Sequence, residues 1–110
     1  MATTELLRRK CSLVETGSHA LADAAADMLL TEIPGWKREE RSIFRAFEFK
    51  NYYQAMAFVN AVAFISHQED HHPDMTVGYN RVQVRYSTHS VNGLSENDFI
   101  CAAKVSALFS

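Results

Sequence analysis

Four of the five histidines in this 110-residue chain lie between residues 67 and 89. His71 and His72 are adjacent, His67 stands four residues before His71, and His89 ends a run of alternating polar and apolar residues. Acidic side chains are close in sequence, namely Glu69, Asp70, Asp74 and, further along, Asp98. Imidazole can both accept and donate a proton near neutral pH, and a carboxylate beside it fixes its tautomer. The cluster therefore has the residue types that proton transfer needs.

On the residues alone, three interpretations of the histidines stay open. In the first, His71 and His72 are exposed loop residues before a proline, and His89 is an ordinary residue at a strand end. In the second, His67 and His71 share one face of a helix and bind a zinc-like metal with His72 or His89. No cysteine is near, and Gln68 follows His67, so an HExxH motif is absent. In the third, the histidines line a cleft without metal and move protons on an uncharged, polar, ring-shaped substrate.

Asp98 also has two expected roles. It follows Ser95 by three residues, which is the spacing of a capping box at the start of a helix. A capping carboxylate can still accept a hydrogen bond from an imidazole, so the two roles are compatible. Met75 and Tyr79 are expected first as strand packing and second as walls of a flat ligand pocket. Trp36, the one tryptophan, is expected in the core.

Hydrophobic periodicity predicts three helices that would frame this cluster. The first covers residues 18–31 and ends at the turn-forming pair Pro34-Gly35. Its inward positions would be Leu21, Ala25, Met28 and Leu29. The second runs from Tyr52 to about His67, and the third starts at the capping box. The inward positions of the third helix would be Phe99, Ala103 and Ala107.

Four strands are predicted between these helices. Residues 36–39 and 42–49 form two strands joined by a short charged turn. After Pro73 the period changes to two, with one strand through Met75 and Val77 and a second over residues 81–88. Asn80-Arg81 lies between these two runs, which predicts a hairpin.

The order of elements, α-β-β-α-β-β-α, predicts a single α+β domain. We expect a four-stranded, mainly antiparallel sheet with three helices on one face, and an N-terminal extension over residues 1–17 before a domain over residues 18–110. The opposite face would meet water or ligand through the polar positions Arg81, Gln83, Arg85 and Ser87. If the alternation persists, His89 points to this polar face.

Composition excludes several classes of protein. Eleven basic and thirteen acidic residues give a net charge of −2, which disfavours a direct nucleic-acid binder. No apolar run approaches a membrane span, and no signal-peptide pattern is present. Cys11 and Cys101 lie far apart in sequence and outside any CxxC pair, so we expect two unremarkable thiols in a reducing compartment, most simply the cytoplasm, with a nuclear or organellar location as an alternative.

Seven spaced positions of this chain resemble the signature of the pterin-4a-carbinolamine dehydratases. The positions that carry the resemblance are His67, His71, His72, Pro73, Tyr79, His89 and Asp98. Segments around them agree, among them Gly35-Trp36, Ser87-Thr88-His89 and Gly93-Leu94-Ser95-Glu96. The likeness extends from about Leu21 to Leu108, so it makes residues 18–110 the dehydratase domain and favours the third interpretation.

The resemblance implies loss of water from 4a-hydroxytetrahydropterin to give quinonoid dihydropterin, which recycles the cofactor of the aromatic amino-acid hydroxylases. It implies no metal and no organic cofactor, and a homodimer or homotetramer. His71 and His89 would be the proton-handling pair, His72 would hydrogen-bond and position the pterin, and Asp98 would orient an imidazole, in the first place that of His89. Further substrate contacts would come from Asp70, Met75, Tyr79 and His67.

Two positions depart from the family pattern. Many members have an acidic residue where this chain has His67. Either the acceptor nitrogen of a neutral imidazole replaces the contact of that carboxylate with substrate, or His67 lies outside the site. The position of Met75 is commonly aromatic, so a softer apolar wall would replace a stacking surface.

The alternative from a different class is a non-catalytic interaction protein, because some relatives resemble a dimerisation cofactor of a transcription factor. The predicted helix over residues 52–67 carries a wide apolar surface that would serve self-association or such a partner. Its two stripes are Tyr52, Met56, Val59 and Ala63, and beside them Phe58, Val62 and Ile65. With a net charge of −2, such a role would act through protein and not by direct contact with DNA.

Overall fold

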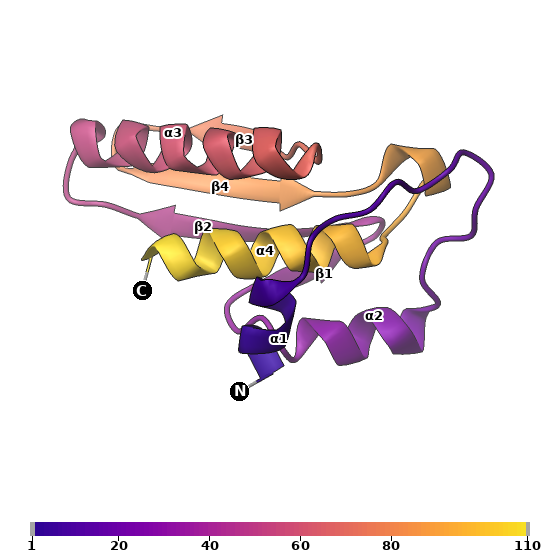
Figure 1. The fold of residues 1–110 in the computed structure, drawn as a ribbon. Coiled ribbons are helices and arrows are strands. Elements are labelled where there is room, and N and C mark those ends of the chain that lie inside the picture. The colour runs from indigo at the N-terminus through magenta and orange to yellow at the C-terminus, as the bar shows by residue number, and fades with distance from the viewer. Residues whose placement is uncertain (1, 110) are drawn as a thin grey trace.

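One antiparallel sheet organises the chain in the computed structural model, which describes residues 2–109 (Figure 1). Its spatial order is β1-β2-β4-β3. The strands are β1 (Lys37–Glu39), β2 (Ser42–Glu48), β3 (Asp74–Val77) and β4 (Arg81–Tyr86). The helices are α1 (Ala2–Arg8), α2 (Asp23–Leu30), α3 (Tyr52–Glu69), the 3₁₀ helix η1 (His89–Val91) and α4 (Glu96–Phe109). The predicted α+β class and the four-stranded antiparallel sheet are confirmed.

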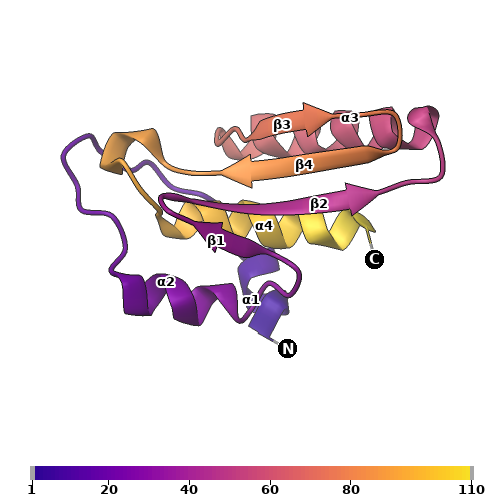
Figure 2. The same ribbon diagram turned by 180° about the vertical axis from the view of Figure 1, so that it is seen from behind.

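β4 is a central strand and follows the predicted alternation. Val82, Val84 and Tyr86 are fully buried, whereas Gln83 and Arg85 between them are only partly covered. β4 pairs with β2 on one side and with β3 on the other, so the predicted hairpin is confirmed. Seen from behind, none of the helices within residues 2–109 lies over the second face of the sheet (Figure 2). On that face the guanidinium of Arg85 lies 4.6 Å from the ring centroid of Phe44.

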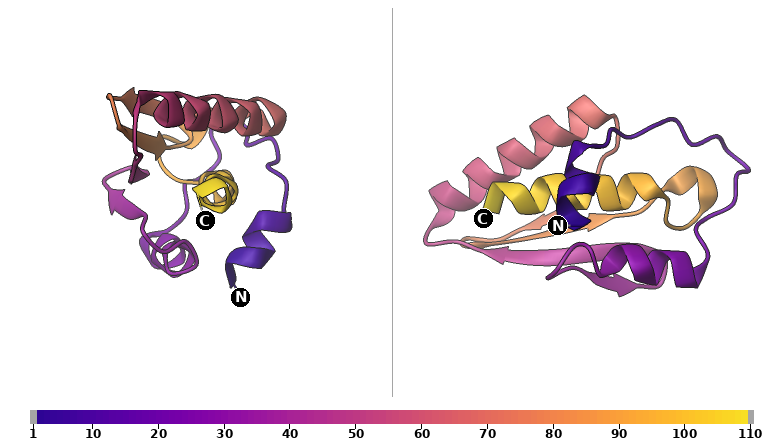
Figure 3. Two further views of the ribbon diagram at one scale, coloured as in Figure 1. Left: turned by 90° about the vertical axis from the view of Figure 1, so that its left-hand side faces the viewer. Right: turned by 60° about the horizontal axis from the view of Figure 1, so that its bottom comes forward.

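α4 lies between the sheet and α1 (Figure 3). Its residues 97–103 are all buried, because the sheet, α3 and α1 enclose the first half of the helix. A helix that is enclosed on all sides needs no single apolar stripe. Phe99 and Ala103 are buried as predicted, but Ala107, on the last turn of the helix, is exposed.

The two other predicted helices lie on the same side of the sheet, and their buried faces match the prediction only in part (Figure 1). α2 is shorter than expected, and Ala26 is its one fully buried residue within the described chain, while Ala25 and Met28 face solvent. In α3 the inner positions are Ala55, Phe58, Val62 and Ser66. Phe58 and Val62 of one predicted stripe are buried as predicted. In the other predicted stripe Tyr52 and Ala63 are exposed, and the two residues between them are half-buried. Small residues such as Ala and Ser can be buried in a close helix contact, and a pattern of large apolar residues does not detect them.

The N-terminal segment, which the sequence predicted as an extension before the domain, packs against the rest of the chain. Leu6 of α1 is only 1% exposed and belongs to the hydrophobic core. The Lys104 ammonium of α4 donates a hydrogen bond to the carbonyl of Leu7 (2.8 Å). α1 therefore covers the side of α4 that faces away from the sheet. Among residues 2–109, none of the helices is both long and apolar enough to cross a bilayer.

The packing of α1 predicts that Leu6→Ala lowers the free energy of unfolding by about 2–5 kcal/mol, because it leaves a cavity against α4. Leu13→Ala is the matched control, since Leu13 is 88% exposed. Urea unfolding followed by circular dichroism measures both. Equal stability of the two variants would contradict the docking of α1.

Candidate active site

A pocket of about 500 Å³ opens where four segments meet. They are residues 11–14, which we call the N-terminal strap, residues 69–74 after α3, residues 87–90 after β4, and Asn97 at the start of α4. The pocket brings together His71, His72 and His89 with the acidic residues Asp70 and Asp74. Two segments of the histidine-rich region line this pocket. One leads from the end of α3 into β3, and the other follows β4.

The end of α3 sets the position of His71. The helix stops at Glu69, and Asp70 adopts a left-handed conformation (φ 53°) that reverses the chain direction. The backbone N–H of His71 then donates to the carbonyl of Ser66 (3.0 Å). The imidazole stacks on the buried ring of Tyr86, with centroids 5.7 Å apart and an interplanar angle of 7°. His67 remains on the exposed surface of the helix, so the predicted pairing of His67 and His71 on one helix face is wrong.

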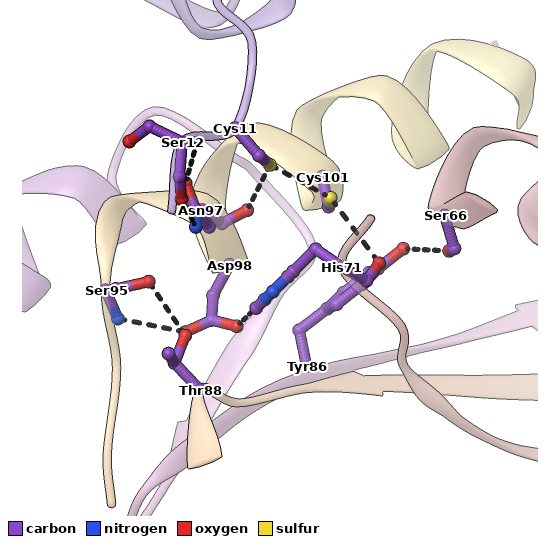
Figure 4. Close-up of polar contacts among 10 residues, drawn as sticks. All are labelled: Cys11, Ser12, Ser66, His71, Tyr86, Thr88, Ser95, Asn97, Asp98 and Cys101. Atoms are coloured by element: carbon purple, nitrogen blue, oxygen red, sulfur yellow. Dashed lines mark hydrogen bonds and ion pairs between the residues drawn. The ribbon is translucent and has the colours of Figure 1, made fainter. Parts of the chain in front are cut away.

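Asp98 is the fully buried carboxylate behind this pocket (Figure 4). One oxygen lies 2.6 Å from Nε2 of His71. The other accepts from the Thr88 hydroxyl (2.8 Å) and from the backbone N–H of Ser95 (2.9 Å). Three donors thus offset the free energy that burying a carboxylate costs. The capping role is confirmed, but the imidazole that Asp98 holds is His71 and not His89.

The carboxylate defines the tautomer of His71. An ionised carboxylate only accepts hydrogen bonds, so the proton of a neutral His71 ring is on Nε2. Nδ1 takes part in none of the hydrogen bonds found among residues 2–109. It is therefore the ring nitrogen with a free lone pair. The side chain is 12% exposed, so most of the ring is shielded while the residue still lines the pocket.

Two neighbours of the His71 ring stay uncharged. Burial is the main cause that raises the pKa of Tyr86, whose hydroxyl shares a hydrogen bond with Ser66 (2.9 Å). A hydrogen bond with Cys11 and then burial raise the pKa of the Cys101 thiol. The raised pKa values mean that neither the phenol nor the thiol adds a negative charge beside His71 near neutral pH.

His89 lies after the end of β4, where the strand alternation has stopped. β4 ends at Tyr86, and His89 begins η1, so the prediction that it continues the polar face does not apply. His89 is exposed and lines the pocket together with His72 and Asp70. No residue among these three uses its side chain in a hydrogen bond within the described chain.

Three predicted substrate contacts do not line this pocket. His67 is exposed on α3, and Met75 packs partly buried against the core. Tyr79 is 68% exposed and stacks on Tyr52, with ring centroids 6.3 Å apart. Trp36 is in the core as predicted, where its indole N–H donates to the Ser106 hydroxyl.

Sequence reasoning missed the N-terminal strap as a wall of the pocket. The amide of Asn97 binds the backbone of Ser12 twice, donating to its carbonyl (2.7 Å) and accepting from its N–H (3.1 Å). The carboxylate of Glu69 accepts from the N–H of Cys11 (2.8 Å). More than fifty residues separate these partners from the strap, so no local pattern could have signalled the contacts.

The metal interpretation requires at least three ligand side chains that lie close together. Within residues 2–109, no group of three or more His, Cys, Asp and Glu side chains is arranged as metal ligands. The arrangement that is present, a buried carboxylate holding one imidazole beside two further histidines, suits proton transfer.

Comparison with known proteins places this chain in a family. The sequence profile described as pterin 4 alpha carbinolamine dehydratase matches residues 19–108. The chain belongs to this family. A protein of Nitrosomonas eutropha, provisionally named pterin-4-alpha-carbinolamine dehydratase, is 58% identical over 105 residues that cover 94% of this chain and 93% of the relative. A relative from Bdellovibrio bacteriovorus with the same provisional name is 54% identical over 98% of this chain and 91% of its own.

Solved structures agree with the fold of the family. A crystal structure from Brucella melitensis, described as a transcriptional coactivator/pterin dehydratase, superimposes with a TM-score of 0.80 at 33% identity, covering 84% of this chain and 100% of that one. A pterin dehydratase-like protein identified as a RuBisCO assembly factor in the alpha-carboxysome gives a TM-score of 0.56 at 27% identity over 66% of this chain and 84% of that one. Solved proteins with this fold are therefore described in more than one way, as a transcriptional coactivator/pterin dehydratase and as a RuBisCO assembly factor.

The hydrogen bonds of Asp98 predict the effect of Asp98→Asn. An amide that keeps accepting from Ser95 must turn its NH₂ group toward His71, so the ring proton moves from Nε2 to Nδ1. We expect this tautomer change in the ¹⁵N chemical shifts of the His71 side chain, and a loss of roughly 1–3 kcal/mol of stability.

The matched control is Asp70→Asn, because Asp70 is exposed and asparagine tolerates its left-handed backbone equally well. Asp70→Asn should change neither the tautomer of His71 nor the free energy of unfolding. An unchanged His71 tautomer in Asp98→Asn would show that the carboxylate does not control the ring.

Proposed function

We propose that this protein dehydrates 4a-hydroxytetrahydropterin to quinonoid dihydropterin and water by histidine general acid–base catalysis, without a metal or organic cofactor. The reaction would recycle the pterin cofactor of aromatic amino-acid hydroxylases. The family and the names of its relatives support the activity. The observation that carries the mechanism is the hydrogen bond between buried Asp98 and His71 at the wall of the pocket.

The reaction needs one group that accepts a proton and one that donates one. The proton on N5 leaves, a double bond forms between N5 and C4a, and the bond from C4a to the hydroxyl oxygen breaks. The departing hydroxyl takes up a proton and leaves as water. Each well-placed acid or base contributes a factor of about 10²–10⁴ in rate, which corresponds to roughly 3–5 kcal/mol of barrier.

His71 is the base in this proposal. Asp98 holds the proton on Nε2, which leaves the Nδ1 lone pair to accept the proton from N5. When the ring becomes an imidazolium, the buried carboxylate 2.6 Å away stabilises the new positive charge. The stack on Tyr86 limits rotation of the ring.

His89 is the acid, and His72 positions the substrate. His89 lies on η1, so it approaches the pocket from a different segment than His71 does. Its exposure lets it regain a proton from water after each turnover. His72 and Asp70 supply an imidazole and a carboxylate that can hydrogen-bond the polar edge of a pterin.

We expect His71→Ala and His89→Ala each to lower the catalysed rate at least about 100-fold. The assay generates 4a-hydroxytetrahydropterin in situ and follows its dehydration by absorbance, in buffer that contains a metal chelator. His19→Ala is the control, because His19 is exposed and lies outside the pocket. A wild-type rate no faster than buffer, from folded protein, would overturn the proposed activity.

An interaction role is the second candidate, and exposed aromatic residues on α3 favour it. Tyr53 and Phe64 share one face of the helix and are 80% and 66% exposed. Apolar surface of this size commonly marks a contact with another protein. We propose that this face of α3 mediates association into a homodimer or homotetramer, or binding of a protein partner.

Light scattering tests this surface. Phe64→Ser should shift the chain toward a smaller species, whereas Met28→Ser, at a residue of α2 that is 72% exposed, should not. If wild-type protein is monomeric throughout the tested concentrations, self-association through α3 is wrong.

A further inference from the structure

Two cysteines that are far apart in sequence meet beside the pocket. The Sγ atoms of Cys11 and Cys101 lie 3.5 Å apart, although 90 positions separate the residues (Figure 4). Cys11 is half-buried on the N-terminal strap and lines the pocket, whereas Cys101 is fully buried on α4. The sequence suggested two unremarkable thiols, but the fold makes them neighbours.

We propose that Cys11 and Cys101 are a redox-active pair, which a low-molecular-weight disulfide converts into an intramolecular disulfide that links the N-terminal strap to α4. The two sulfur atoms need to approach by about 1.5 Å to reach the bond length of a disulfide. The modification is independent of the proposed dehydratase activity, because no substrate takes part in it.

The surrounding contacts hold the two thiols together. The Cys11 thiol also lies 3.6 Å from the carbonyl of Asn97, and its backbone N–H donates to Glu69. Asn97 fixes the next residue of the strap, Ser12, through two hydrogen bonds. Because the two thiols are held close together, each is present at a high effective concentration for reaction with the other.

The different exposure of the two thiols sets the order of the reaction. Cys11 reaches the pocket, so its thiolate attacks the reagent RSSR, forms a mixed disulfide and releases RS⁻, which takes up the proton that Cys11 lost. The Cys101 sulfur then attacks the Cys11 sulfur while its proton passes to the departing sulfur of the reagent, which leaves as the second RSH. In total, two thiols lose two electrons and two protons, and RSSR becomes two RSH.

The link would lie next to the paired His71 and Asp98. Cys101 is one helical turn after Asp98, and its Sγ atom lies 4.0 Å from the carbonyl oxygen of His71. The disulfide would therefore hold the strap wall of the pocket covalently against the helix that carries Asp98.

Incubation of the folded protein with oxidised glutathione tests the pair. Wild type should lose the mass of two hydrogen atoms without gaining glutathione, and its Tm should rise by about 10 °C, because the link constrains the unfolded chain. Dithiothreitol should reverse both changes. Cys101→Ala should stop at the mixed disulfide on Cys11, and Cys11→Ala should not react, because Cys101 is buried.

Circular dichroism of each variant before the reaction establishes that it is folded, and Cys101→Ser replaces Cys101→Ala if the latter is not. A stable glutathione adduct on wild type, or disulfide-linked dimers in place of the internal link, would overturn the proposal. Both readouts are made without a pterin, so they are unaffected if the protein has no dehydratase activity.

Discussion

The hydrogen bonding of one buried carboxylate organises this protein around its pocket. Asp98 is fully buried, and such a group is tolerated only when donors surround it. Its three donors come from different parts of the chain: the turn after α3, the residue that follows β4 and precedes η1, and the cap of α4. The need to satisfy this carboxylate therefore fixes how α3, β4 and α4 meet. The same bonds orient the imidazole that faces the pocket.

α4 connects this site to the rest of the fold. Its first half is enclosed by the sheet, α3 and α1, so Asp98 is held by a helix that has little freedom to move. Asn97, the preceding residue, binds the backbone of the strap. Two adjacent side chains on one helix turn thus hold opposite walls of the pocket, one through His71 and the other through Ser12. This arrangement links the N-terminal strap to the site, although the strap lies before the family match, which begins at residue 19.

Most of the fold could be predicted from local pattern. The alternation over β4 indicated its buried face, the spacing from Ser95 to Asp98 indicated the start of α4, and the element order indicated the α+β class. The wrong predictions concern which helix residues are buried, because the elements packed around a helix decide that. Ala26 and Ser66 are buried, although a search for large apolar residues passes over them, and α1 was not predicted because a seven-residue helix depends on tertiary packing.

The sequence by itself determined which chemical groups the site has. The types and spacing of His71, His72, His89 and Asp98 indicated the family before any contact was known, and that resemblance favoured proton transfer over the two other interpretations. Only the tertiary structure decided that Asp98 holds His71, that His67 lies outside the pocket, and that Cys11 meets Cys101. Side-chain periodicity is a local property of a helix or strand. Which distant side chains meet depends on chain reversals such as the left-handed turn at Asp70, which carries His71 off its helix and toward α4.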